Sequence, residues 1–79
     1  MEIRAKIRAF LAKYLQHVEL GDDQDIFAMG LVNSLFAMQL VLFVEKEFGV
    51  AVSNEDLEVE NFRSIHAISH LIERKTITV

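Results

Sequence analysis

The sequence predicts an all-α fold, an up-and-down four-helix bundle with three main helices and one short one. Apolar residues recur every three or four positions in three separate stretches, the spacing of one face of an α-helix. Proline is absent and only three glycines occur, so little in the chain interrupts helices. At 79 residues we expect one domain, near the size at which a single core is barely sufficient.

The first predicted helix extends from Glu2 to about Val18. Its apolar residues follow helical spacing and are expected in the core: Ile3, Ile7, Phe10, Leu11, Tyr14 and Val18. Its basic residues lie largely on the opposite side: Arg4, Lys6, Arg8 and Lys13. We interpret this basic side as solvated surface, because a membrane-binding helix would use the apolar stripe that the core requires. Tyr14 is interpreted as a packing residue whose hydroxyl reaches the surface.

A connection without clear periodicity follows, from Glu19 to Asn33. Loops of this length are usually functional or disordered, and this one is too apolar for disorder, so we expect it to pack against the helices. We predict Phe27 as its anchor. An acidic cluster in this loop lacks the central glycine and the terminal glutamate of a calcium-binding EF-hand, so no metal site is predicted at Asp22, Asp23 and Asp25.

The second predicted helix runs from Leu35 to Phe48, and Asn33 is suited to cap its start. The Asn side-chain oxygen can accept a hydrogen bond from one of the backbone N–H groups that a helix start leaves unpaired. Ser34 is therefore expected in the first turn, exposed. Gly30 allows the loop to turn sharply into the helix, which places the serine hydroxyl at a corner that another protein can reach.

This helix carries two apolar stripes. One is predicted to be the buried face: Ala37, Leu40, Val41, Val44 and Phe48. The other lies on a different side, and we call it the exposed strip: Leu35, Met38 and Leu42. Such a helix is either enclosed on all sides or keeps one apolar strip free for a partner. In so short a chain we favour the second arrangement.

Two shorter elements complete the predicted fold. Ser53 and Asp56 approximate a capping box, which predicts a brief third helix around Glu55 to Val59. Asn61 or Ser64 is expected to cap a last helix through about Arg74, with core residues Ile65, Ile68, Leu71 and Ile72. His66 and His70 stand four residues apart, but no third ligand is in sight, so we interpret them as surface histidines. The core is expected to span about residues 3–74, and residues 75–79 are expected to fray.

The charge distribution limits the classes of partner that we expect. Residues 21–60 hold nine acidic and one basic side chain, although the net charge of the chain is only −4. An acidic surface argues against nucleic acid as a partner and suits proteins with basic docking patches. No stretch has the roughly 18 apolar residues needed to cross a bilayer, and the first ten residues lack the apolar centre of a signal peptide, so we expect no membrane partner and a cytoplasmic protein.

No catalytic machinery is visible around Ser34. The sequence has no GxSxG motif, no spacing that predicts a triad and no Gly-rich phosphate loop. Cysteine is also absent, so any thioester chemistry needs sulfur from an attached cofactor. We therefore expect no enzyme: chemistry at Ser34 must come from enzymes acting in trans.

The stretch DIFAMGLVNSL, residues 25–35, followed by the apolar helix that ends in EKEFG, resembles the acyl carrier proteins. The resemblance extends from Ile3 to about Ile72. It implies that Ser34 receives 4′-phosphopantetheine from coenzyme A and that the arm's thiol carries an acyl group as a thioester. The usual motif of the family is Gly, two variable residues and Asp-Ser-Leu, whereas this chain has Asn33. Asparagine keeps the capping function but removes a carboxylate that in the family helps to position metal-bound coenzyme A.

The resemblance also implies partners for a monomeric carrier: a phosphopantetheinyl transferase, acyl-loading and modifying enzymes, and an acyltransferase or ketosynthase. They would dock on the exposed strip, flanked by Glu45 and Glu47. The run NSLFAMQL is similar to discrete carriers of methoxymalonyl, hydroxymalonyl or aminomalonyl extender units in polyketide and antibiotic biosynthesis. Two alternatives stay open: a peptidyl or D-alanyl carrier, and an unmodified helical module that binds a partner helix along the same strip.

Overall fold

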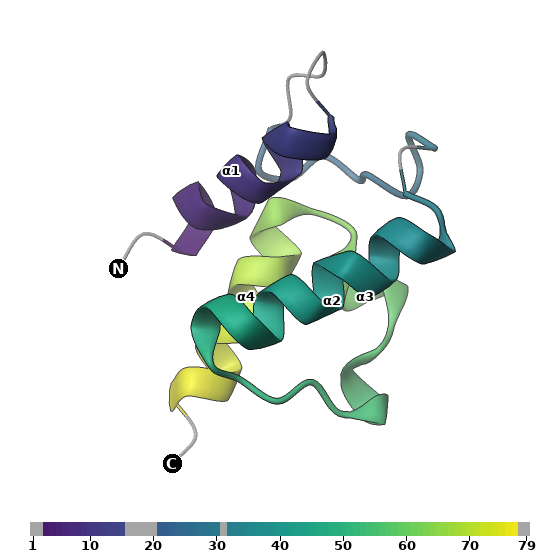
Figure 1. The fold of residues 1–79 in the computed structure, drawn as a ribbon. Coiled ribbons are helices and arrows are strands. Elements are labelled where there is room, and N and C mark those ends of the chain that lie inside the picture. The colour runs from purple at the N-terminus through teal and green to yellow at the C-terminus, as the bar shows by residue number, and fades with distance from the viewer. Residues whose placement is uncertain (1–2, 16–20, 31, 78–79) are drawn as a thin grey trace.

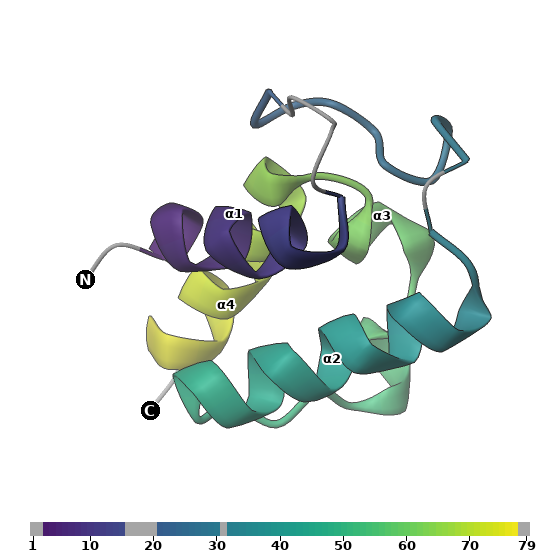
Figure 2. The same cartoon turned by 45° about the horizontal axis from the view of Figure 1, so that its top comes forward.

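The computed structural model describes residues 3–15, 21–30 and 32–77. In chain order its elements are α1 (Ile3–Tyr14), α2 (Ser34–Phe48), one 3₁₀ turn (Asn54–Asp56), α3 (Val59–Phe62) and α4 (Ile65–Ile77) (Figure 1). These ranges contain no strand, which confirms the predicted all-α class with three main helices and a short one. Helix α4 packs most closely against α1 and α3, and α2 completes the bundle (Figures 1 and 2). No helix in these ranges is both long and apolar enough to span a membrane.

The core is a single cluster of apolar side chains from all four helices and from the loop before α2. Its buried members are Ile7, Leu11, Ile26, Phe36, Leu40, Val44, Phe62, Ile65, Ile68, Leu71 and Ile72. The predicted core stripe of the last helix is confirmed in full. Burial of these side chains supplies the main favourable term for folding, about 25 cal/mol per Å² of apolar surface removed from water.

Helix α1 ends at Tyr14, although the apolar pattern predicted an end near Val18. The sequence there contains neither glycine nor proline, so the pattern carries no stop signal; Val18 itself lies outside the described residues. Tyr14 is 51% exposed, and its ring packs against Phe10, with the centroids 5.0 Å apart. The prediction of a packing residue at the surface is confirmed for Tyr14.

The caps of α2 explain its bounds. Asn33 has extended backbone angles, and its Oδ1 accepts a hydrogen bond from the Phe36 N–H at 2.8 Å. Gly49 ends the helix with φ at +65°, a left-handed angle that residues with a Cβ rarely adopt.

The buried residues of α2 are Phe36, Leu40 and Val44, so the predicted stripe is confirmed at Leu40 and Val44. Ala37, Val41 and Phe48 are only half-buried. The sequence prediction left out Phe36, whose ring centroid lies 5.2 Å from that of Tyr14 on α1. A helical wheel cannot show this contact, because it depends on where α1 lies.

The loop before α2 is anchored by Ile26 rather than by Phe27. The Ile26 side chain is 1% exposed, and its N–H donates a hydrogen bond of 2.7 Å to the carbonyl oxygen of Arg63, between α3 and α4. Phe27 lies beside the core but is only partly buried. The carboxylate of Asp25 accepts hydrogen bonds from the N–H groups of Phe27 and Ala28, which closes a tight local turn. The prediction of Phe27 as anchor was wrong because the backbone bond to Arg63 draws its neighbour inward.

The segment between α2 and α4 contains two short helical elements where the sequence predicted a single helix over 55–59. A 3₁₀ turn covers Asn54–Asp56, and the helix α3 begins only at Val59 and buries Phe62. The predicted link between Ser53 and Asp56 is present, with the Ser53 N–H and hydroxyl both donating to the Asp56 carboxylate at 3.0 and 2.9 Å. The helix does not continue directly, because Leu57 has non-helical backbone angles, and the Asp56 carbonyl accepts hydrogen bonds from the Glu58 N–H and from the Asn61 side chain.

Helix α4 is capped by Ser64, whose Oγ accepts a hydrogen bond from the Ala67 N–H at 3.0 Å. It continues to Ile77, past the predicted end near Arg74, so residues 75–77 of the tail that was expected to fray are helical, and residues 78 and 79 lie outside the described residues. The ammonium group of Lys75 pairs with the carboxylate of Asp56 and holds this last turn against the 3₁₀ turn. This bond, together with those from Ser53, lowers the pKa of Asp56 to about 2.

Candidate functional site

The candidate site begins at Ser34, the first residue of α2, whose side chain is exposed. The preceding Asn33 caps the helix with its side chain, and its carbonyl oxygen accepts the Ala37 N–H at 2.9 Å. Gly30 has φ at +73°, as expected for a sharp turn ahead of the helix. Cap and turn together hold the Ser34 backbone at the corner where the loop enters α2.

Ser34 differs from the three other serines of the chain. The Ser53 hydroxyl donates to Asp56, Ser64 is buried and caps α4, and the buried Ser69 donates to the carbonyl oxygen of His66 at 2.8 Å. No bond to the Ser34 hydroxyl is seen within residues 3–15, 21–30 and 32–77. Among the serines, Ser34 is therefore the one whose hydroxyl is both exposed and free to be modified.

The electrostatics at this corner favour an anionic substituent. The first turn of α2 contains no acidic residue, and aligned peptide dipoles place about half a positive charge at a helix N-terminus. Asn33 adds no charge, whereas an aspartate would oppose a phosphate group attached next to it. A phosphodiester on Ser34 would therefore lie in a favourable field.

The exposed strip runs along α2 from the turn that carries Ser34. Leu35, Met38 and Leu42 are 66%, 66% and 61% exposed, so α2 is not enclosed on all sides and the second of the two predicted arrangements is present. Large apolar side chains exposed in a row are unusual in a monomer and mark a surface that another protein can cover.

Glu45 and Glu47, expected beside this strip, both have partners within the chain. The Glu45 carboxylate accepts a hydrogen bond from the Val52 N–H at 2.9 Å and so fixes the chain after Gly49. The Glu47 carboxylate lies 3.1 Å from the ammonium group of Lys6 on α1. The charged group at this end of α2 without a partner in the described ranges is Lys46. The sequence could have indicated it, because it is the only basic residue between 21 and 60.

An apolar pocket of about 190 Å³ opens one helical turn from Ser34. Ala37, Leu40 and Val41 form its α2 wall, and Phe27 and Phe62 contribute from the loop and from α3. Leu57 and Val59 lie at the same pocket and are themselves half exposed, at 50% and 56%. Sequence reasoning missed these two residues. The signal was present: both are apolar and stand among acidic residues in a short segment with little else to bury.

The other candidate groups of the sequence do not come together into a site. His66 and His70 are exposed, with their rings stacked 6.1 Å apart, and the Nδ1 of His66 lies 3.0 Å from the guanidinium of Arg4. Asp22 forms ion pairs with Arg4 and Arg8 of α1, which ties the loop to that helix. Within the described ranges, no three potential ligand residues cluster as a metal site would require.

A family model described as "Phosphopantetheine attachment site" matches residues 3–72, which include Ser34, the exposed strip and the apolar pocket. A search of curated proteins found no match.

Proposed function

The chain belongs to the phosphopantetheine attachment family, whose members carry a covalently bound 4′-phosphopantetheine, and we propose that it is an acyl carrier protein modified at Ser34. The arm supplies the thiol that this cysteine-free chain lacks, and acyl groups are held on it as thioesters. The chain's own contribution is to present Ser34 Oγ as the attachment atom and to dock the enzymes that modify and load the arm.

The main observation behind this proposal is that the Ser34 hydroxyl, unlike those of the other serines, is both exposed and without a hydrogen-bond partner in the described ranges. This hydroxyl is exposed at the start of a helix whose dipole favours a phosphodiester, while the other serine hydroxyls are committed to internal bonds. The physical advantage of the arm is tethering. A covalently held intermediate meets each docked active site at an effective concentration of the order of millimolar, and this gain requires no contact between the carrier and the acyl group.

The experiment is intact-mass spectrometry after incubation with coenzyme A, magnesium and a broad-specificity phosphopantetheinyl transferase. The wild type should gain the mass of one phosphopantetheinyl group, and Ser34→Ala should gain none. Ser53→Ala is the matched control, because it removes another exposed serine and should still be modified in full. An unmodified wild type, or modification that persists in Ser34→Ala, would refute the assignment.

We further propose that the exposed strip is where acyl-loading and modifying enzymes dock, among them an acyltransferase or ketosynthase. Leu35 follows Ser34 directly, so an enzyme that covers the strip also faces the arm. Glu45 and Glu47 remain in this proposal as flanking charges, although both would have to contact a partner while bound to Val52 and Lys6.

For the cargo we propose a small acyl group, such as a malonyl-type extender unit of polyketide and antibiotic biosynthesis, handled in the cytoplasm. The apolar pocket is large enough for a small acyl group, because a cavity of about 150 Å³ holds a molecule of the size of benzene and this one measures about 190 Å³. A polar extender unit would stay mostly outside, where partner enzymes can reach it. Trials with candidate loading enzymes would distinguish this cargo from the aminoacyl group of a peptidyl or D-alanyl carrier.

The exposed strip itself supports one function of a different class. An unmodified helical module would use Leu35, Met38 and Leu42 to bind an amphipathic helix of a partner. The same mass experiment separates the two, because such a module gains no mass with coenzyme A and the transferase.

A further inference from the structure

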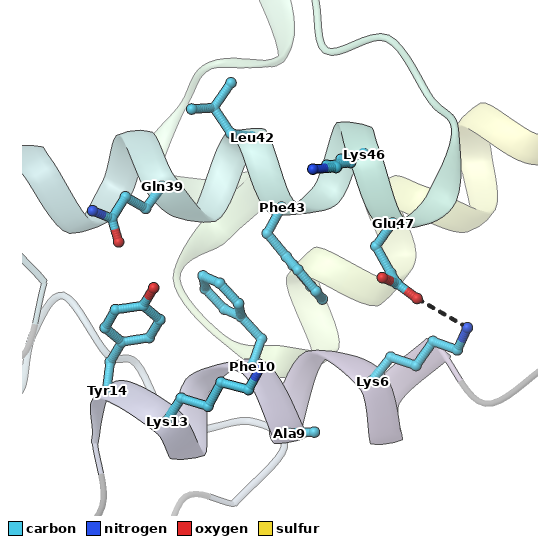
Figure 3. Close-up of a pocket in the computed structure, with 10 residues that line it drawn as sticks. All are labelled: Lys6, Ala9, Phe10, Lys13, Tyr14, Gln39, Leu42, Phe43, Lys46 and Glu47. Atoms are coloured by element: carbon cyan, nitrogen blue, oxygen red, sulfur yellow. Dashed lines mark hydrogen bonds and ion pairs between the residues drawn. The ribbon is translucent and has the colours of Figure 1, made fainter.

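A second recessed surface lies between α1 and α2. This groove has a volume of about 600 Å³ and is open along its length. Figure 3 shows the two helices antiparallel, with Lys6 of α1 facing Glu47 of α2 at one end and Tyr14 facing Gln39 at the other. It shares no lining residue with the apolar pocket near Ser34.

The floor of the groove is a preformed aromatic surface. The rings of Phe10 and Phe43 stack with centroids 4.2 Å apart and planes within 17°, and Tyr14 extends the cluster at 5.0 Å from Phe10. Neither phenylalanine is fully buried, and Tyr14 is half-exposed. Because these rings hold one another in place, a ligand could cover them without much loss of side-chain entropy.

The rim of the groove is cationic. Lys13 stands on α1 and Lys46 on α2, both exposed, and neither has an ion-pair partner in the part of the chain that the structure describes. Lys6 is neutralised by Glu47 at 3.1 Å. One unpaired positive charge therefore stands on each side of an aromatic floor, in a chain whose residues 21–60 are otherwise strongly acidic.

We propose that this groove docks an amphipathic helix of a partner protein, with an apolar centre and acidic residues along both flanks. A groove between two antiparallel helices receives the side chains of a third helix, and the stretch from Lys6 to Tyr14 is about 12 Å long, enough for two turns. Apolar side chains one turn apart would cover Phe10 and Phe43. Acidic residues on the two flanks would meet Lys13 and Lys46.

The positive charge of the groove rim favours acidic partners, whereas the acidic surface of the chain favours basic ones. Enzymes with basic patches suit the acidic part of residues 21–60, whereas the lysine rim repels them and attracts acidic helices. Leu42 belongs both to the exposed strip and to the groove lining. A helix in the groove would therefore cover one end of the strip and compete with partners docked there. This inference does not depend on attachment of the arm to Ser34.

The test uses two synthetic amphipathic helical peptides with the same three leucines on one face, flanked by glutamates in one peptide and by lysines in the other. Fluorescence anisotropy with the unmodified protein should show at least tenfold tighter binding of the acidic peptide, weakened by salt. Lys13→Glu and Lys46→Glu should each weaken binding of the acidic peptide about threefold to tenfold, because attraction becomes repulsion. Arg63→Glu is the matched control, with the same change of charge away from the groove, and should change binding less than twofold.

Amide shift mapping on ¹⁵N-labelled protein supplies a second readout that a folding defect would not mimic. Addition of the acidic peptide should shift amides of residues 9–14 and 39–47 and leave those around Leu57 and Val59 unchanged. Equal affinity for the two peptides, an equal effect of Arg63→Glu, or shifts centred on the Leu57 side would each overturn the proposal. So would a dimer in sedimentation that Lys46→Glu dissociates and Leu35→Asp does not, since a second copy would then be the occupant of the groove.

Discussion

Replacement of Ile26 by alanine tests how the loop that delivers Ser34 is held. Ile26 is 1% exposed, so the substitution removes three buried carbon groups, worth about 0.8 kcal/mol each, and leaves a cavity behind. Together these terms predict a loss of about 3 kcal/mol in the free energy of unfolding. For a domain of this size that is a fall in melting temperature of about 12 to 24 °C. Met29→Ala is the matched control, because it shortens an exposed apolar side chain of the same loop and should cost less than about 0.5 kcal/mol.

Urea denaturation of both variants measures these losses. An unchanged slope of the unfolding free energy against urea concentration would show that the same cooperative unit unfolds. Hydrogen exchange adds a local measurement, since the Ile26 N–H bonded to Arg63 should exchange faster once the side chain no longer holds the loop in place. The rate of phosphopantetheine attachment should also change, because Ser34 would be presented from a looser corner. A loss below about 1 kcal/mol in Ile26→Ala, or one equal to that of Met29→Ala, would show that Ile26 is not the anchor.

Three further predictions follow from the contacts of the site and of the last helix. Leu35→Asp should slow transfer reactions with partner enzymes while the circular dichroism of the helices stays unchanged; unaltered transfer rates would remove the exposed strip from docking. Asn33→Ala should lower the free energy of unfolding by about 1 kcal/mol, because the Phe36 N–H loses its acceptor. Asn33→Asp should keep the cap, and comparison of its rate of phosphopantetheine attachment with that of the wild type measures the effect of the carboxylate. The bonds to Lys75 and Ser53 lower the pKa of Asp56 from 3.8 to about 2, so the stability that they provide should be present above pH 4 and be lost as the pH falls toward 2. The urea midpoints of the wild type and of Lys75→Met should therefore converge across that pH range. A constant difference between the two midpoints would contradict the assignment.

Where a feature depends on neighbours along the chain, it could be predicted from the sequence. The Asn33 cap and the position of Ser34 in the first turn are local matters of side-chain reach, and the exposed strip follows from helical periodicity. The hydrogen bond between Ser53 and Asp56 could be predicted for the same reason, because the two residues are three positions apart. The all-α class could likewise be predicted, because apolar periodicity and the lack of proline are properties of local sequence.

What the sequence determined by itself is thus the three main helices, the Asn33 cap and the corner that presents Ser34. Only the tertiary structure decided which of two adjacent apolar residues anchors the loop, because Ile26 is drawn inward by a carbonyl group on Arg63, far along the chain. It also decided that Glu47 pairs with Lys6 across two helices, and that Lys13 and Lys46 stand on either side of one aromatic groove. Such contacts join residues tens of positions apart, and their geometry depends on how whole helices pack, which no local spacing encodes.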